Sequence, residues 1–521
     1  MHRLLPLLLL LTLPAFAQDP PVRVPAPAGA LAGPLTVPLP ETLAALTGDP
    51  LYATADVSVQ VVDAASGAPV WAWGDDRALT PASTMKLLTA ATALRELGPG
   101  FRFPTWVQTT GDLDAQGVLS GSLYIKGQGD PTMVVERMWR MILDIRLRGI
   151  NEVRGDVVFD DGYFQDSPLI PGWTEESDVV DGPAYYAPLG ALSVNYNIAA
   201  IIVRPGPTVG SSAVAAFETP TPAVALENHL TTGSARSRKW IKLERVLVDA
   251  RGVELKPPFT AATTGVATFR LTGNVPLDSD PDELFRSLSD PLTNYIGTFE
   301  ALAKQHGLKV RGDFKAGPTP TSAKLLLKSE SDPLVEILAQ MNKMSNNFMA
   351  EQVLRSVGAE KYGLPGTTEK GVRAIGDYLG SLGIPADSYQ VANGSGLTRL
   401  TRIRPSAMNA VLVNMYRNPA YATEFVNTLS VGGRDGTLRY RFREDGMEGR
   451  VRGKSGTLDG VRCLAGYVDA VDGRTYAFTF LVNNINGASA RAKGTHDRLV
   501  LALAGTSGNV VDGAEDPAEA N

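Results

Sequence analysis

One stretch near the N-terminal end of the chain has a clear helical pattern of apolar and polar residues, with both helix ends marked. Thr80 and Pro81 suit the cap and the first helical position, and Gly98 suits the left-handed turn after the last residue. Between them, strong helix formers carry a wide apolar face, so we expect most of this helix to be buried. Ser83 and Lys86 then project from the same side, one turn apart.

Other segments alternate between apolar and polar residues, as β-strands with one buried face do. Two of them, 56–62 and 69–73, predict a hairpin directly before the Ser83 helix. Near the C-terminal end three more segments predict an antiparallel meander, and these are 449–457, 462–468 and 475–482. Helical periodicity returns after Asp290-Pro291 and after Asp332-Pro333, where a serine or aspartate cap precedes a proline.

The segment between residues 101 and 285 has a different character. Short strand-like runs are separated there by Gly, Pro and Asp turns, and one helical run at 134–147 interrupts them. The strand-like runs are 119–126, 152–159, 199–203, 240–248 and 267–271. This change of pattern indicates a mostly β region inserted into another domain.

The two ends of the chain differ from the rest in composition. Residues 1–17 combine a basic start, an apolar run and a small-residue cleavage pattern, which predicts a secretory signal peptide. Residues 18–40 are rich in Pro and Ala and predict an extended lead-in, and 507–521 predict a flexible acidic tail. No later segment is apolar enough to span a bilayer. We expect a mature chain without a transmembrane anchor, in the periplasmic or cell-wall space.

Composition argues against several classes of function. The net charge is −6 and both signs are mixed along the chain without a basic cluster, so we expect no nucleic-acid partner. The single cysteine, Cys463, lies in a strand-like run and predicts a small core residue. The four histidines are scattered without the spacing of metal ligands. We expect no metal, no cofactor and no histidine-based triad.

The spacing of Ser83 and Lys86 suits nucleophilic catalysis, because a serine hydroxyl is a poor nucleophile until a base removes its proton. A lysine one turn away is such a base once its pKa falls from about 10.4 toward 7. That shift corresponds to about 4 kcal/mol, within reach of burial plus a second nearby cation. Ser-x-x-Lys is common by chance, however, so the assignment needs partners from elsewhere in the chain.

Two further groups supply such partners. Ser345 and Asn347 belong to a Ser-Asn-Asn loop between two apolar helical runs, which would hold a hydroxyl and a carboxamide rigidly. Lys454, Ser455 and Thr457 belong to a Lys-Ser-Gly-Thr run on the first strand of the predicted meander. There a substrate backbone can form ladder hydrogen bonds, and the cation can hold a terminal carboxylate. Taken alone, the first group is usually a polar helix connection and the second an ordinary strand.

Together and in this order, the three motifs resemble the signature of the serine penicillin-recognising enzymes. The long β-rich segment between Ser83 and Ser345 makes the chain similar to one branch, the D-alanyl-D-alanine carboxypeptidases and endopeptidases of the penicillin-binding-protein-4 type, peptidase family S13. The resemblance covers about residues 45–505. Further matching runs are 127–131, 191–197, 393–399 and 433–438.

The chain departs from the family pattern at two positions. Ser455 stands where the family more often has threonine, but both residues carry a hydroxyl, so carboxylate binding should survive. Gln128 stands where the family usually has glycine, in the predicted insertion and away from the chemistry. Neither departure removes a group that the reaction needs.

The resemblance implies an α+β fold. Its serine β-lactamase/transpeptidase-like catalytic domain has an antiparallel sheet between helical layers, and we assign it to residues 41–103 plus 286–506. A large β-rich insertion forms one or two smaller domains, and we assign it to residues 104–285.

The resemblance also assigns roles in acylation. Ser83 would attack the carbonyl of the penultimate D-Ala and become acylated, with Lys86 as the general base. Ser345 would relay a proton to the leaving amine, and Asn347 would bind the peptide amide of the substrate. The backbone N–H groups of Ser83 and Thr457 would form the oxyanion hole.

Other residues would bind the substrate. Lys454 and the hydroxyls of Ser455 and Thr457 would hold the C-terminal carboxylate, and the Lys454 cation would also depress the pKa of Lys86. Arg399 would contact the stem peptide. A last group would line the pocket for the third residue of that peptide, namely Asp178, Tyr185 and Tyr186. For these and for Arg399, a structural or surface role is equally compatible with the sequence.

The leading hypothesis is a secreted serine DD-carboxypeptidase that also cleaves peptidoglycan cross-links as an endopeptidase. Its partners would be stem peptides, cross-links and β-lactam antibiotics, which would acylate and inhibit it. A β-lactamase would need fast deacylation, and no glutamate stands in a recognisable deacylating motif. A non-catalytic wall-binding protein would have lost a motif residue, yet all are present. A general esterase would show no preference for a D-Ala terminus.

Overall fold

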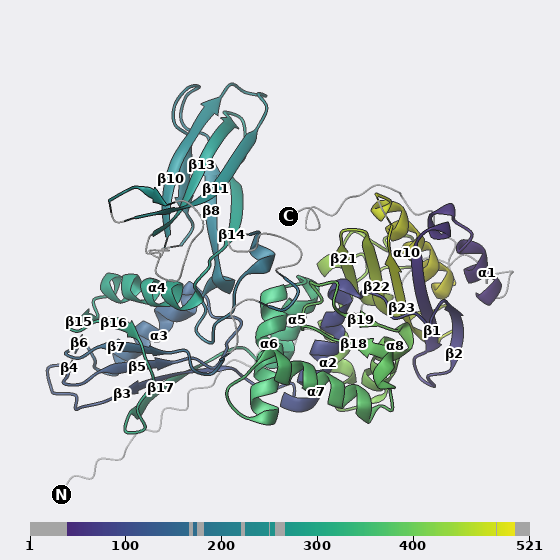
Figure 1. Ribbon diagram of the computed structural model, residues 1–521, viewed down its shortest axis with the longest axis horizontal. Coiled ribbons are helices and arrows are strands. Elements are labelled where there is room, and N and C mark those ends of the chain that lie inside the picture. Colours follow the sequence, from purple (N-terminus) through teal and green to yellow (C-terminus); the bar gives the residue numbers. More distant parts are fainter. Residues whose placement is uncertain are drawn as a thin grey trace, which may run out of the picture.

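The computed structural model describes residues 39–165, 170–173, 182–219, 224–249, 251–255, 266–485 and 487–505. Three parts are visible: a domain built on a six-stranded sheet, an inserted domain beside it, and a β-rich arm that projects away from both (Figure 1). The predicted signal peptide, the acidic tail and most of the lead-in lie outside the described residues. Within the described residues, none of the helices has the length and apolar character needed to cross a membrane.

The six-stranded sheet is antiparallel throughout, with the strand order β2–β1–β23–β22–β21–β20. It confirms the predicted hairpin and the predicted meander, whose strands pair as neighbours although they lie at opposite ends of the chain. The strands are β1 (Asp56–Asp63), β2 (Pro69–Trp73), β20 (Ser430–Val431), β21 (Val451–Leu458), β22 (Val461–Asp469) and β23 (Thr475–Asn483).

Helices cover both faces of this sheet, because successive strand residues point to opposite sides. On β22, Cys463 and Ala465 pack with α2 and α5 to α9, whereas Leu464 and Val468 pack with α1 and α10. Cys463 is therefore a core residue, as predicted. The helices are α1 (Leu39–Leu46), α2 (Lys86–Leu97), α5 (Leu334–Lys343), α6 (Asn347–Tyr362), α7 (Thr368–Ser381), α8 (Pro405–Arg417), α9 (Ala422–Thr428) and α10 (Ser489–Ala504).

The inserted domain has its own core between two helices and two small sheets with the orders β16–β7–β5–β3–β17 and β15–β6–β4. Its helix α3 confirms the predicted helical run. The elements are β3 (Pro104–Thr109), β4 (Val118–Leu119), β5 (Leu123–Lys126), α3 (Val135–Leu147), β6 (Glu152–Val153), β7 (Val157–Asp160), α4 (Pro291–Gln305), β15 (Lys309–Val310), β16 (Phe314–Ala316) and β17 (Lys324–Glu330).

The projecting arm pairs its strands in the orders β14–β8–β9 and β10–β13–β11–β12, around one shared apolar core. Three of its strands (β8, β11 and β13) were predicted, and β9, β10, β12 and β14 were missed. The strands are β8 (Ile198–Arg204), β9 (Val214–Phe217), β10 (Val224–Gly233), β11 (Trp240–Val248), β12 (Glu254–Leu255), β13 (Val266–Pro276) and β14 (Asp282–Ser287).

The predicted end of the insertion at residue 285 is wrong. Helix α4 packs in the core of the inserted domain, and β17 pairs antiparallel with β3. The chain therefore returns to the domain of the six-stranded sheet only near Ser331. Apolar periodicity reveals that a helix has a buried face, but it does not reveal which core buries that face.

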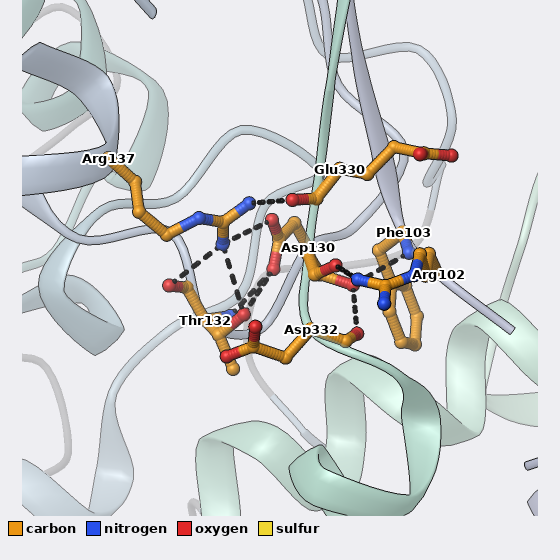
Figure 2. A network of polar contacts seen from close by, with 8 residues as sticks. Arg102, Phe103, Asp130, Thr132, Arg137, Glu330 and Asp332 are labelled. Atoms are coloured by element: carbon orange, nitrogen blue, oxygen red, sulfur yellow. Dashed lines mark hydrogen bonds and ion pairs between the residues drawn. The ribbon is translucent and has the colours of Figure 1, made fainter. Parts of the chain in front are cut away.

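Polar contacts join the two crossings between the domains (Figure 2). Ser331 Oγ accepts a hydrogen bond from the Phe103 backbone N–H at 2.9 Å, so it does not cap α5 as predicted. Arg137 Nη2 donates to the Glu330 carbonyl at 2.8 Å, and its Nη1 lies 2.7 Å from Asp130 Oδ2. The Phe103–Ser331 bond holds the outgoing and returning segments side by side, and Arg137 ties α3 to the end of the returning strand β17.

Candidate active site

Ser83 lies in a tight turn rather than in a regular α-helix. Ala82–Met85 form a 3-10 turn, and α2 begins only at Lys86. Thr80 does not cap this helix, because Met85 stands directly before α2 and Pro81 directly before the 3-10 turn. The Thr80 backbone N–H instead donates to Asn483 Oδ1 on β23 at 3.0 Å, which ties the turn to the sheet. Ala82 has a φ of 46°, an unusual value for a residue with a side chain, so the residue before Ser83 is strained.

Two glycines allow other segments to approach this turn closely. Gly396 has a φ of +76°, and a Cβ atom there would lie 2.0 Å from the Ala82 carbonyl oxygen. A Cβ atom on Gly456 of β21 would lie 2.7 Å from the Pro81 carbonyl oxygen and 3.1 Å from the Ser83 backbone nitrogen. The strand with the Lys-Ser-Gly-Thr run therefore passes directly beside the amide of Ser83.

Lys86 is fully buried and its Nζ contacts three oxygen atoms. Ser83 Oγ lies at 3.0 Å, Asn347 Oδ1 at 2.6 Å and the Ser395 carbonyl oxygen at 2.9 Å. The amide and carbonyl oxygens can only accept hydrogen bonds, whereas the Ser83 hydroxyl can also donate. A neutral amine has two N–H bonds and one lone pair. If the N–H bonds point at the two obligate acceptors, the lone pair faces the Ser83 hydroxyl.

The environment of Lys86 favours the neutral amine. Burial lowers the pKa of Lys86 well below its usual value, and the nearby Lys454 cation lowers that pKa further. The Glu351 carboxylate opposes both effects. The predicted influence of Lys454 is therefore present, but loss of hydration is the larger cause.

Ser345 and Lys454 form a second contact pair. Lys454 is fully buried, and its Nζ donates to Ser345 Oγ at 2.9 Å and to the Ser455 carbonyl at 2.8 Å. Ser345 has a φ of 55°, where α5 ends, and Asn346 caps α6 by accepting from the Met349 N–H at 2.9 Å. The strained turn and the cap together fix the Ser345 hydroxyl over β21.

Asn347 joins the site to the loop before the projecting arm. Its Oδ1 accepts from Lys86, and its Nδ2 donates to the Tyr185 carbonyl at 3.2 Å. Tyr186 is buried against Trp173, with 5.7 Å between the ring centroids. Asp178, predicted for the same pocket, lies outside the described residues.

The remaining predicted residues lie on β21 or contact the turn that follows it. Thr457 Oγ1 accepts a hydrogen bond from Arg462 Nη1 on the neighbouring strand at 2.5 Å. Arg399 Nη2 donates to the Asp459 carbonyl at 2.7 Å, so in this structure Arg399 contacts the β21–β22 turn. The described ranges contain no group of three or more His, Cys, Asp or Glu side chains that could hold a metal ion.

Sequence reasoning missed two parts of the site. The Ser395 carbonyl contacts Lys86, and the fully buried Glu351 carboxylate accepts from the backbone N–H groups of Gly394 and Ser395. The residues 393–396 were noted as a family-like run, but without a role. An acidic residue within the apolar run 348–357 is the signal that identifies Glu351, because a buried carboxylate needs partners.

Comparisons with known proteins agree with this geometry. The family model described as the D-Ala-D-Ala carboxypeptidase 3 (S13) family matches residues 39–504. A D-alanyl-D-alanine carboxypeptidase of Actinomadura sp. (strain R39) is 30% identical over 485 residues, which cover 90% of this chain and 85% of that protein.

Solved structures confirm the predicted fold class. Penicillin binding protein 4 from Haemophilus influenzae superposes with a TM-score of 0.72 at 22% identity, covering 89% of this chain and 97% of that one. The same protein complexed with a novel β-lactam gives a TM-score of 0.69 at 21% identity, covering 89% and 98%. The fold match therefore extends over the inserted domain as well as the catalytic domain.

Proposed function

Because the chain belongs to the D-Ala-D-Ala carboxypeptidase 3 (S13) family of serine peptidases, we propose that it removes the terminal D-alanine from peptidoglycan stem peptides. The observation that carries the proposal is the set of contacts around Lys86, which leaves its lone pair for the Ser83 proton. The family itself was predicted from the three motifs, and that prediction is confirmed.

Acylation follows from these contacts. Ser83 Oγ attacks the carbonyl carbon of the penultimate D-Ala while its proton passes to Lys86 Nζ. The backbone N–H groups of Ser83 and Thr457 stabilise the oxyanion. When the tetrahedral intermediate collapses, the peptide C–N bond breaks, and a proton delivered through Ser345 leaves with the D-Ala amine. Lys454 lies in contact with Ser345 and is the group that can supply that proton.

Substrate binding is assigned to β21 and its neighbours. The Lys454 cation and the hydroxyls of Ser455 and Thr457 bind the terminal carboxylate, as Thr457 can accept from Arg462 and donate its own hydrogen to the ligand. Asn347 contacts the peptide amide of the substrate through the carboxamide that also holds Lys86. Water then hydrolyses the acyl-enzyme and frees Ser83.

The proposal has three finer parts. The enzyme also cleaves cross-links as an endopeptidase. In both reactions Ser83 attacks the same D-Ala carbonyl, and only the amine that leaves is different. Penicillins acylate Ser83 and deacylate slowly, which is supported by the β-lactam complex of the structurally similar Haemophilus influenzae protein. Residues 1–17 direct export, so the enzyme acts in the periplasmic or cell-wall space.

The test is release of D-alanine from a diacyl-L-Lys-D-Ala-D-Ala peptide. We expect release by the wild type, none by Ser83→Ala, and unchanged release by Ser66→Ala, the same substitution in an exposed hairpin turn. Hydrolysis of simple esters without any preference for a D-Ala terminus would instead identify a general esterase. Rapid destruction of penicillin without D-Ala release would identify a β-lactamase.

A further inference from the structure

Glu351 is a buried carboxylate at the base of the candidate site. It lies on α6, one turn after Asn347, and none of its surface is exposed. Its Oε1 accepts from the Ser395 N–H at 2.7 Å, and its Oε2 accepts from the Gly394 N–H at 2.9 Å. Arg355 lies one turn further along α6, and its positive charge acts on the same carboxylate.

The two N–H groups belong to a turn whose carbonyls face α2. The Ser395 carbonyl accepts from Lys86 Nζ at 2.9 Å, and the Gly394 carbonyl accepts from Thr89 Oγ1 at 2.7 Å. Asn393 Oδ1 closes the turn by accepting from the Gly396 N–H at 2.9 Å. The Ser395 carbonyl belongs to the same peptide unit as the Gly396 N–H, which Asn393 holds. Glu351 holds the two preceding peptide units of the turn through the Gly394 and Ser395 N–H groups.

We propose that Glu351 is a positioning residue for the general base, because it holds the turn whose Ser395 carbonyl directs the lone pair of Lys86 toward Ser83. This inference rests on the proposed function, in which Lys86 accepts the Ser83 proton. Within the described residues, Glu351 forms no hydrogen bond with Ser83 or Lys86, so it acts through the turn and through its charge.

Only a carboxylate of this length matches the two N–H groups. A glutamine offers one acceptor oxygen, and its NH₂ group would face a backbone N–H, so one buried donor would lose its partner. An aspartate keeps both oxygens but is one methylene shorter, so it cannot reach the same positions from α6. The two variants therefore separate the charge of Glu351 from its geometry.

The charge of Glu351 also acts on Lys86. The charged groups that act on Lys86 are Lys454 on β21, which lowers its pKa, and Glu351 on α6, which raises it. Burial raises the pKa of the Glu351 carboxyl, whereas the hydrogen bonds from Ser395 and Gly394 and the positive charge of Arg355 lower it. Removal of the Glu351 charge lowers the pKa of Lys86 further. Acylation requires neutral Lys86, so its rate rises with pH as Lys86 loses its proton. This rise, the acid limb of the pH profile, then moves to lower pH.

The experiment measures the rate of acylation by a fluorescent penicillin from pH 5 to 10 for the full chain. We expect Glu351→Gln to lower the plateau rate about ten- to a hundred-fold and to shift the acid limb to lower pH. Glu351→Asp should lower the plateau by a similar factor and leave the limb in place. Asn409→Ala is the control, since it removes a buried amide whose bonds join α8 to β1 and β23.

Several results would overturn the proposed role of Glu351. Wild-type rate and pH dependence in Glu351→Gln would overturn the proposal, as would an equal loss of rate in Asn409→Ala, because general destabilisation would then explain the effect. If Glu351→Gln does not fold, Glu351→Asp decides, since a wild-type plateau rate overturns the proposal. Failure of the wild type to acylate would contradict the proposed function instead.

Discussion

The active site and the junction between the two domains contain similar hydrogen bonds, but these bonds have different consequences. At both places a nitrogen-containing side chain donates to a backbone carbonyl group, from Lys86 to Ser395 and from Arg137 to Glu330. Arg137 also contacts the Asp130 carboxylate at 2.7 Å, whereas the three contacts of Lys86 are neutral oxygens. The ion pair joins α3 to the loop that carries Asp130, beside the end of β17. For Lys86, burial and the neighbouring Lys454 cation lower the pKa of the amine, which favours its neutral form.

Backbone conformation separates the two regions as well. The junction continues a regular antiparallel ladder, in which Glu330 pairs with Pro104 and Ser329 pairs with Thr105. Around the active site, by contrast, Ala82 has a φ of 46° and Ser345 a φ of 55°. Strained residues persist only where neighbouring contacts hold them, so the catalytic region gives up stability to place its reactive groups.

Replacement of Lys86 should produce the largest effect. We expect Lys86→Met to lower the acylation rate about a hundred- to ten-thousand-fold, because a positioned base contributes that much. The variant should fold, at a cost of about 1–3 kcal/mol for the two acceptors left unpaired. Acylation rates corrected for the folded fraction measure the effect. A rate within about ten-fold of the wild type would contradict the base assignment.

The close approach of the 393–396 turn can be tested with a pair of glycines. Gly396→Ala should lower acylation and stability together, at a cost of about 1–3 kcal/mol, because its Cβ would overlap the Ala82 carbonyl. Gly363→Ala is the matched control, since its φ of +83° is similar but no atom lies within 4 Å of the added Cβ. Equal effects in both variants would attribute the loss to backbone strain rather than to crowding.

The pH dependence of acylation should report the Lys86–Lys454 pair. Acylation rises with pH as Lys86 loses its proton, with a midpoint well below the usual lysine pKa, because burial and Lys454 lower it. Lys454→Met removes one of these causes, so the midpoint should move to higher pH. Single-turnover acylation across pH measures the shift. A midpoint that stays in place or falls would show that Lys454 does not act on Lys86.

Disruption of the junction should have the smallest effect on chemistry. Arg137→Ala leaves Asp130 and the Glu330 carbonyl without this partner, so we expect a loss of about 1–3 kcal/mol in stability and an acylation rate within about two-fold of the wild type. Arg251→Ala, at an exposed ion pair with Asp249, should change stability by less than about 0.5 kcal/mol. Thermal unfolding of each variant measures the change in stability, and acylation of the same samples measures the change in rate. A large loss of acylation in Arg137→Ala would mean that the inserted domain controls the site.

Local sequence patterns predicted some parts of the fold and site but not others. The meander, the first hairpin and α3 follow from local patterns, and the structure places Ser83, Lys86 and Asn347 in direct contact. Local patterns carry no information on which distant segments pack together, and this is why α4 was assigned to the wrong domain.

The supporting groups of the site were hidden for the same reason. Ser395 acts through its backbone carbonyl, which no side-chain motif reveals. Thr80 has the composition of a helix cap, but its backbone is held by Asn483 from the far end of the chain. The hydrogen-bond partners of Glu351 lie in the 393–396 turn, more than 40 residues away along the chain, so the sequence around Glu351 does not reveal them. Long-range partners, rather than local propensity, decided each of these cases.

The central claim is that a neutral Lys86 activates Ser83 for covalent acyl transfer. The most direct test is the intact mass of the mature chain after incubation with benzylpenicillin, beside Ser83→Ala. The account predicts one lasting adduct on the wild type and none on the variant. An intact antibiotic with no adduct on the wild type, or an equal adduct on Ser83→Ala, would contradict it.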